Sequence, residues 1–119
     1  MPECSFLIPL QRDAEIADGK AHARSAWKWL HRELGLAFEA MTIAPGEYTG
    51  VWPSPLSKKN VSDKSKKYTI AIPRQRVQEL RAILQKACVV FAQQSLYLSV
   101  AGNVEFIQAP DNQEEFHLP

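Results

Sequence analysis

The segment from residue 74 to residue 93 constrains the fold most, because its apolar residues recur at the spacing of a helix. They are Val77, Leu80, Ile83, Leu84, Ala87, Cys88 and Phe91. Arg, Gln, Glu and Lys occupy the positions between them, so the spacing predicts an amphipathic helix with one buried face. Strands are predicted on either side of it, over 68–72 and 95–101, because large apolar residues there alternate with small or polar ones.

The first half of the chain repeats this arrangement less regularly. A second amphipathic helix is predicted over residues 20–34, with Gly35 expected at its C-terminal cap. Short apolar segments predict strands over 5–10 and 37–44. Residues 47–67 are rich in Pro, Ser and Lys, so we expect a long irregular loop there.

The resulting order is strand, helix, strand, strand, helix, strand. Residues 104–107 fit either a separate fifth strand or the end of a bulged fourth one. This order predicts an α+β, ferredoxin-like βαββαβ fold, in which an antiparallel sheet carries both helices on one face. A length of 119 residues with 45% hydrophobic residues suits one domain. We expect it over residues 1–109, followed by a flexible acidic tail over 110–119.

The strand predicted over residues 5–10 is apolar at successive positions, which is typical of a strand buried on both faces. Because the helices cover one face only, we expect a second copy of the chain to cover the other, giving a homodimer through the sheet face. Trp29 lies two positions from Trp27, on the opposite side of the predicted helix. We therefore expect Trp29 to be partly exposed and to be a candidate contact for a protein partner.

Several classes of function lack their sequence signatures. No apolar run approaches the length that spans a bilayer, and Cys4 and Cys88 are too few and too far apart for a disulfide framework, so a cytoplasmic protein without a membrane segment is expected. The histidines are His22, His31 and His117, and the first two, nine positions apart on the predicted helix, point to opposite faces and cannot bind one metal ion together. Phosphate-binding loops and common catalytic motifs are absent, and we expect no metal or cofactor.

Three short motifs resemble a known family. They are Gly50-Val51-Trp52, Asp63-Lys64-Ser65 ahead of an apolar strand, and Phe91-Ala92-Gln93-Gln94-Ser95-Leu96. Together they resemble DUF3574, a family of small bacterial and phage proteins of unknown function, over about residues 5–107. This chain has Asp63 where the family tends to have Glu, and Leu96 where it has Val. The resemblance implies the ferredoxin-like fold and no known activity.

Four residues form the best candidate pocket: Arg12, Trp52, Gln93 and Ser95. An indole, an amide and a hydroxyl could line a small-molecule site, and an enzyme with its pocket between the sheet and the helices is one hypothesis. His31 is a candidate base, with Arg12 or Asp13 beside it. The alternative is structural, with Trp52 at the edge of the core and the two polar residues bonded to backbone groups where the helix ends.

Positive charge is concentrated between residues 51 and 100, which hold nine Lys and Arg against two acids. Five lysines make a candidate anion or nucleic-acid patch: Lys58, Lys59, Lys64, Lys66 and Lys67. The aromatic motif of RNA-recognition sheets is missing, and a lysine-rich loop is usually only solvated. The leading interpretation is therefore a self-associating binding or interaction module without catalysis, of a kind that a phage or mobile element could encode. The alternatives are a small dimeric enzyme and a nucleic-acid binder, so the sequence leaves enzymatic activity undecided.

Overall fold

The computed structural model describes residues 1–54 and 56–110, with the side chain of Trp52 left out. The tail predicted over 110–119 and His117 therefore lie, apart from Pro110, outside the described residues. The strands are β1 (Glu3–Pro9), β2 (Thr42–Ile43), β3 (Tyr48–Pro53), β4 (Asn60–Ala71), β5 (Ser95–Val100) and β6 (Asn103–Gln108). The helices are α1 (Arg24–Ala37) and α2 (Val77–Val90), the latter preceded by a 3₁₀ turn over Arg74–Arg76. No helix in the described residues is long and apolar enough to cross a membrane.

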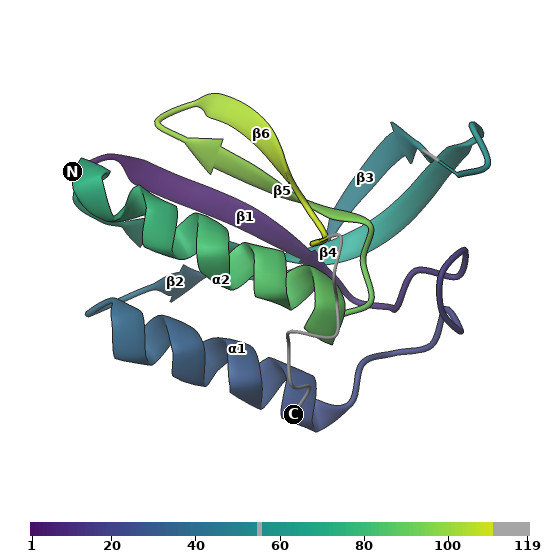
Figure 1. The fold of residues 1–119 in the computed structure, drawn as a ribbon, viewed down its shortest axis with the longest axis horizontal. Helices are drawn as coiled ribbons and strands as arrows, with labels where there is room; N and C mark the ends of the chain where they lie inside the picture. The colour runs from purple at the N-terminus through teal and green to yellow at the C-terminus, as the bar shows by residue number, and fades with distance from the viewer. Residues whose placement is uncertain (55, 111–119) are drawn as a thin grey trace.

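The strands form one antiparallel sheet in the order β2-β4-β1-β5-β6, and β3 pairs with the free part of β4. Both helices lie against the same face of this sheet (Figure 1). The prediction of an α+β fold with an antiparallel sheet is thus confirmed. The sheet has six strands instead of four or five. Along the chain, the elements differ from the predicted order by the strands β3 and β6.

Residues 47–67 were predicted as an irregular loop, and this prediction is wrong. β3 and the first half of β4 occupy most of the segment as an antiparallel ribbon, with Tyr48 opposite Ser65 and Pro53 opposite Asn60. The ribbon extends away from the helices (Figure 1). Backbone hydrogen bonds hold a ribbon that carries few buried apolar side chains, so its sequence lacks the hydrophobic alternation of a core strand.

The residues after β5 form a separate strand, which decides between the two readings of 104–107. Ala101 and Gly102 form a two-residue turn in which both residues have positive φ, 50° and 86°. Such turns match the twist of the flanking strands and join tight hairpins. β5 and β6 are therefore two strands of one hairpin, paired from Val100–Asn103 to Ser95–Gln108.

Helix α1 differs from its prediction at both ends and in rotation. It starts at Arg24 and continues through Gly35 to Ala37, because Gly35 does not adopt the left-handed conformation that would end it. The strand predicted over 37–44 shrinks to β2. Trp29 is only 7% exposed, whereas Trp27 is partly buried, so the expected exposure of Trp29 is wrong. The buried residues of α1 are Ala26, Trp29, Leu30 and Leu34, so the helix is rotated such that Trp29, and not Trp27, shares the inner stripe with Leu30.

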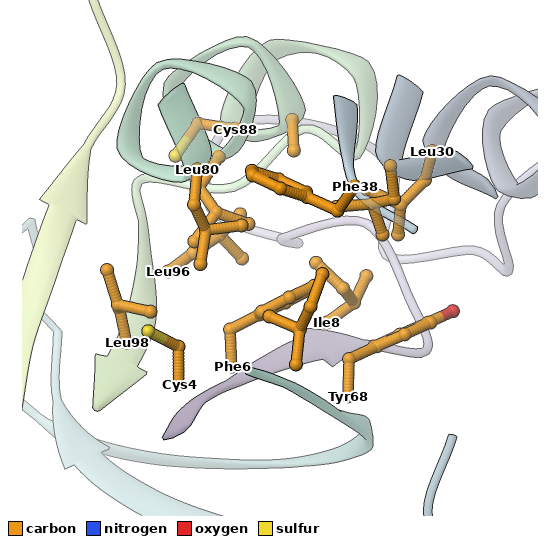
Figure 2. Packing of buried hydrophobic residues seen from close by; sticks show 14 of the residues in the cluster. Cys4, Phe6, Ile8, Leu30, Phe38, Tyr68, Leu80, Cys88, Leu96 and Leu98 are labelled. Carbon is orange, nitrogen blue, oxygen red and sulfur yellow. The ribbon is translucent and has the colours of Figure 1, made fainter. Parts of the chain in front are cut away.

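The core fills the space between the sheet and the two helices (Figure 2). Alternate residues of β1 point into it, and Phe6 stacks on Tyr68 of β4 with ring centroids 5.0 Å apart. Cys4 and Cys88 are buried in the same core as free thiols. Because Phe6 and Ile8 face the helices, Leu7 and Pro9 face the opposite side of the sheet, where the candidate site lies.

Candidate functional site

A cavity of about 490 Å³ lies on the face of the sheet away from the helices, where β1 ends. Its walls come from three places: the loop after β1, the β3–β4 ribbon, and the β5–β6 hairpin with the turn that precedes it. The polar residues among its lining are Gln11, Arg12, Asp13, Glu15, Ser54, Ser62, Asp63, Ser65, Gln93, Gln94, Ser95, Tyr97 and Gln108. A volume of this size suits a small metabolite.

The loop after β1 closes on itself. Gln11 bridges to Ala21, and the backbone amide of Arg12 donates to the carbonyl of Lys20 at 2.8 Å. The Arg12 guanidinium donates two hydrogen bonds of 2.7 Å to the Asp18 carboxylate. Arg12 therefore holds the pKa of Asp18 well below its usual range. Its own charge is balanced within the loop, so it adds little positive charge to the cavity.

The turn after α2 supplies the opposite wall. Ala92 ends the helix in the left-handed region with φ of 49°, and the amide of Gln93 donates back to the carbonyl of Cys88 at 2.8 Å. The chain then reverses toward β1. The buried Gln93 side chain donates to the backbone carbonyl of Gln11 at 2.8 Å and to that of Phe91 at 2.9 Å. Gln93 thus ties the turn to the start of the loop.

Two carboxylates of the loop accept hydrogen bonds from neighbouring groups. Asp13 accepts hydrogen bonds from the amide of Glu15 at 2.8 Å and from the Gln94 side chain at 2.7 Å. Glu15 accepts a short hydrogen bond from the Ser54 hydroxyl, which crosses the cavity mouth to the β3–β4 ribbon. The Ser54 hydroxyl, and after it that of Ser57, lowers the pKa of Glu15. Glu15 therefore carries negative charge at neutral pH.

Asp63 is different, because one of its carboxylate oxygens has no partner. Its Oδ1 is buried without a hydrogen bond in the described structure, and so is the hydroxyl of Ser65 two positions further along β4. Both residues line the cavity. Burial raises the pKa of Asp63 to about 6; the nearby Ser65 hydroxyl lowers it, and the Asp13 charge raises it. A buried carboxylate oxygen without a partner is costly unless a ligand satisfies it.

Two aromatic rings complete the cavity on the hairpin side. Tyr97 of β5 and Phe106 of β6 meet edge to face, with centroids 6.0 Å apart. Phe106 is 50% exposed although it lines the cavity. The cavity thus joins an acidic end near Asp63 to an aromatic wall.

The structure brings three of the four predicted pocket residues to one cavity, since Arg12, Gln93 and Ser95 all line it. Trp52 lies in β3, and its side chain is outside the described residues. We expected the pocket between the sheet and the helices, but the cavity lies on the opposite face of the sheet. His31 is also not beside Arg12 or Asp13, because its Nε2 lies 2.9 Å from the Tyr68 hydroxyl on the helix side.

The five lysines of the predicted patch are distributed over several surfaces. Lys58 and Lys59 lie in the turn between β3 and β4. Lys66 lies 4.7 Å above the Trp27 ring on the helix side, whereas Lys67 lies 5.6 Å from the Tyr48 ring on the other side. Lys64 forms an exposed ion pair with Glu47 at 3.6 Å.

Sequence reasoning missed Asp63, Gln94 and Tyr97 as site residues. Asp63 stood among lysines in a segment taken for a loop, and only the strand register places it with Ser65 on the cavity side.

In the described part of the chain, no group of three or more His, Cys, Asp and Glu side chains could hold a metal ion.

Comparisons with known proteins identify the fold. No protein-family model and no curated protein match the chain. Among solved structures, a phage SAM lyase in complex with S-methyl-5′-thioadenosine matches with a TM-score of 0.66 and 13% identity, covering 93% of this chain and 92% of that chain. A phage SAM lyase in the apo state matches with a TM-score of 0.61 and 13% identity, covering 93% and 91%. The chain therefore shares the fold of these proteins, and the resemblance to DUF3574 stays a prediction.

Proposed function

We propose that the chain is an enzyme that binds a sulfonium nucleoside of the S-adenosylmethionine class in the cavity and cleaves a carbon–sulfur bond of it. The observation that carries the proposal is the buried, unpartnered Oδ1 of Asp63 in a cavity of metabolite size. The shared fold with two phage SAM lyases supports the choice of ligand.

The charges around the cavity favour a cation. Asp13, Glu15 and Asp63 line it, while Arg12 is neutralised by its ion pair with Asp18. A positively charged ligand would keep Asp63 ionised and compensate for its burial. An anionic ligand would meet three carboxylates in a partly enclosed space, which disfavours it strongly.

The aromatic wall suits the other end of such a ligand. The faces of Tyr97 and Phe106 can stack on a purine or attract a sulfonium cation. Gln108 on the same hairpin carries an amide that can donate to and accept from a base edge. A cavity with an acidic end and an aromatic end therefore fits a molecule that is cationic at one end and planar at the other.

The chemistry needs no further reactant. When the bond between sulfur and the amino-acid carbon breaks, its electron pair stays on sulfur, and the sulfonium becomes the neutral thioether S-methyl-5′-thioadenosine. The carbon left behind then either bonds to an oxygen of the ligand's own carboxylate, which closes a lactone, or forms a double bond to its neighbouring carbon as that carbon loses a proton. Asp63, with a pKa of about 6, can accept such a proton or stabilise the positive charge that develops on the carbon as the bond breaks.

Calorimetric titration tests this proposal, because it reports both binding and turnover. S-adenosylmethionine is expected to bind at least tenfold more tightly than S-adenosylhomocysteine, which has the same nucleoside but a neutral sulfur. Asp63→Asn is expected to abolish this preference. Glu47→Gln, which removes a charge from the same ribbon outside the cavity, serves as the control and is expected to keep it. Equal affinity for the two ligands, or no heat with either, would refute the proposal.

Other readings of the sequence remain proposals beside this one. The fold can be regarded as a ferredoxin-like arrangement to which β3 and β6 have been added, and the two phage neighbours support a phage source for the gene. Self-association through the open sheet face, an interaction module without catalysis and a cytoplasmic location remain predictions. So does nucleic-acid binding, which the scattered lysines do not favour.

A further inference from the structure

The two edges of the sheet differ in how they are protected. One edge is formed by the two-residue β2 and by β3, which contains Gly50 and ends in Pro53. Short strands, glycine and proline all discourage pairing with another strand. The other edge is β6, six residues long and without glycine or proline, and no strand of the described residues pairs with its outer side.

β6 presents Val104, Phe106 and Gln108 on the sheet face away from the helices, and it carries no unpaired charge. Val104 is 53% exposed and Phe106 is 50% exposed, both on the sheet face away from the helices. The single charge of the strand, Glu105, points to the other face and is held by Arg81 at 2.7 Å and 3.0 Å. An edge strand with exposed apolar side chains and no free charge is the kind that pairs with another chain.

The geometry of the hairpin shows which backbone groups are free. Val100 and Asn103 flank a two-residue turn, so they exchange both hydrogen bonds, as do alternate pairs beyond them. The amides and carbonyls of Val104, Phe106 and Gln108 therefore point outward. These are the groups that an added strand would bond.

We propose that β6 pairs antiparallel with β6 of a second copy of this chain across a twofold axis at Phe106, which joins the two sheets into one. A twofold axis perpendicular to the sheet places residues of the same face opposite each other. Centred on Phe106, the pairing sets Phe106 against its own copy and Val104 against Gln108, and it uses all the outward amides. Centred on Glu105, it would oppose two carboxylates on one face, which is destabilising.

The pairing also covers apolar surface. Phe106 already meets Tyr97 edge to face in each chain. The second copy brings an equivalent pair of rings alongside, so four aromatic side chains form one row across the axis. Aromatic cross-strand pairs are among the more favourable ones in sheets. This inference does not depend on the proposed enzymatic activity.

Cysteine cross-linking tests the register without reference to activity. In the proposed pairing the Cα atoms of the two copies of residue 106 lie about 5.5 Å apart, within the range of a disulfide. Phe106→Cys is therefore expected to form a covalent dimer under mild oxidation. Val104→Cys is the matched control, because its two copies would lie about 13 Å apart along the paired strands. The native Cys4 and Cys88 are buried and should not contribute.

Sedimentation of the unmodified chain supplies a second readout. The chain is expected to be a dimer, and Val104→Pro, which removes an outward amide and no bond to β5, is expected to shift it to a monomer. Ser5→Lys, on the central strand β1, is expected to leave the dimer intact, whereas association through the sheet face would be disrupted by it. The proposal would be overturned if the unmodified chain were a monomer at high micromolar concentration. It would also be overturned if the dimer were lost in Ser5→Lys but not in Val104→Pro. Cross-linking of Glu105→Cys in place of Phe106→Cys would contradict the proposed register.

Discussion

The side-chain amide of Gln94 donates a 2.7 Å hydrogen bond to Oδ2 of Asp13, although 81 positions separate the two residues in the sequence. The same amide nitrogen lies 3.4 Å from Glu15. One amide thus joins the turn after α2 to two acids of the loop after β1. This contact fixes two walls of the cavity relative to each other, and the acidic end depends on it.

Replacing that donor by a carboxylate should open the cavity. Gln94→Glu keeps the shape of the side chain but sets a third carboxylate against Asp13 and Glu15, so we expect a loss of about 1–3 kcal/mol in the free energy of unfolding. The loss should shrink in acid, because protonation of the carboxylates removes their mutual repulsion. Urea denaturation at two pH values measures both effects. Gln85→Glu on the exposed side of α2 is the control; an equal loss there would show that the Gln94 contact is not responsible.

Asp63 should make the protein less stable as the pH rises from 4 to 6. Its pKa in the folded protein is about 6 against an ordinary value of 3.8, so the folded state binds the proton more tightly, and ionisation costs stability within this window. Asp63→Asn should remove that slope and stabilise the protein at pH 7 by about 1 kcal/mol, after allowance for solvent screening. The melting temperature measured between pH 4 and pH 8 checks this. A variant that keeps the slope would contradict the assigned pKa.

The affinity for a cationic ligand should rise with pH, whereas the stability of the protein without ligand falls. A cation needs the ionised carboxylate, so the affinity for S-adenosylmethionine should rise as the pH increases through about 6 and then level off. The dissociation constant at pH 5 and pH 7.5 measures this. An affinity that does not change with pH would show that Asp63 does not contact the ligand.

His22 should contribute a stability that is lost in acid. Burial lowers the pKa of His22 from its ordinary value of 6.5, and its Nε2 donates to the carbonyl of Pro9 at 2.7 Å while Nδ1 is buried without a partner. The neutral form is thus favoured by folding, and stability should fall as the pH drops below 6.5. His22→Gln should reduce this fall by about 0.5–1 kcal/mol, allowing for partial exposure. Denaturation at pH 5 and pH 7 tests it, and an unchanged slope would exclude His22.

The left-handed turn at Ala92 predicts a stabilising substitution. A residue with a Cβ atom is strained at φ of 49°, whereas glycine is not, so Ala92→Gly should raise the free energy of unfolding by about 0.5–1 kcal/mol. Ala82→Gly, at an exposed position inside α2, should instead lower it by about 1 kcal/mol. Melting temperatures compare the two. A loss of stability in both variants would mean that Ala92 is not strained.

The sequence was most informative where apolar spacing is strong. The stripe of α2 and the alternation of Tyr68, Ile70 and Ile72 predicted the helix and the core half of β4. The ribbon half of β4 was missed because hydrogen bonds to β3 hold it in place of a buried face. Asp63 lies in that half, so its place in the site could not be seen from spacing.

The candidate pocket was likewise predicted only in part from the sequence. Gln93 and Ser95 were predicted because an amide and a hydroxyl could line a pocket together with an indole, and they do line the cavity. Their meeting with Arg12 depends on the Gln93 bond to Gln11, a contact across 82 positions that no local pattern encodes. The rotation of α1 that buries Trp29 likewise depends on how the helix packs on the sheet.

The most direct test of the central claim is mass spectrometry of the products formed when the purified chain is incubated with S-adenosylmethionine. We predict that S-methyl-5′-thioadenosine accumulates with time and in proportion to the protein. Asp63→Asn should slow this at least tenfold while remaining folded, and Glu47→Gln should not. Absence of the thioether with unmodified, folded protein, or equal rates for Asp63→Asn and the unmodified chain, would contradict the account.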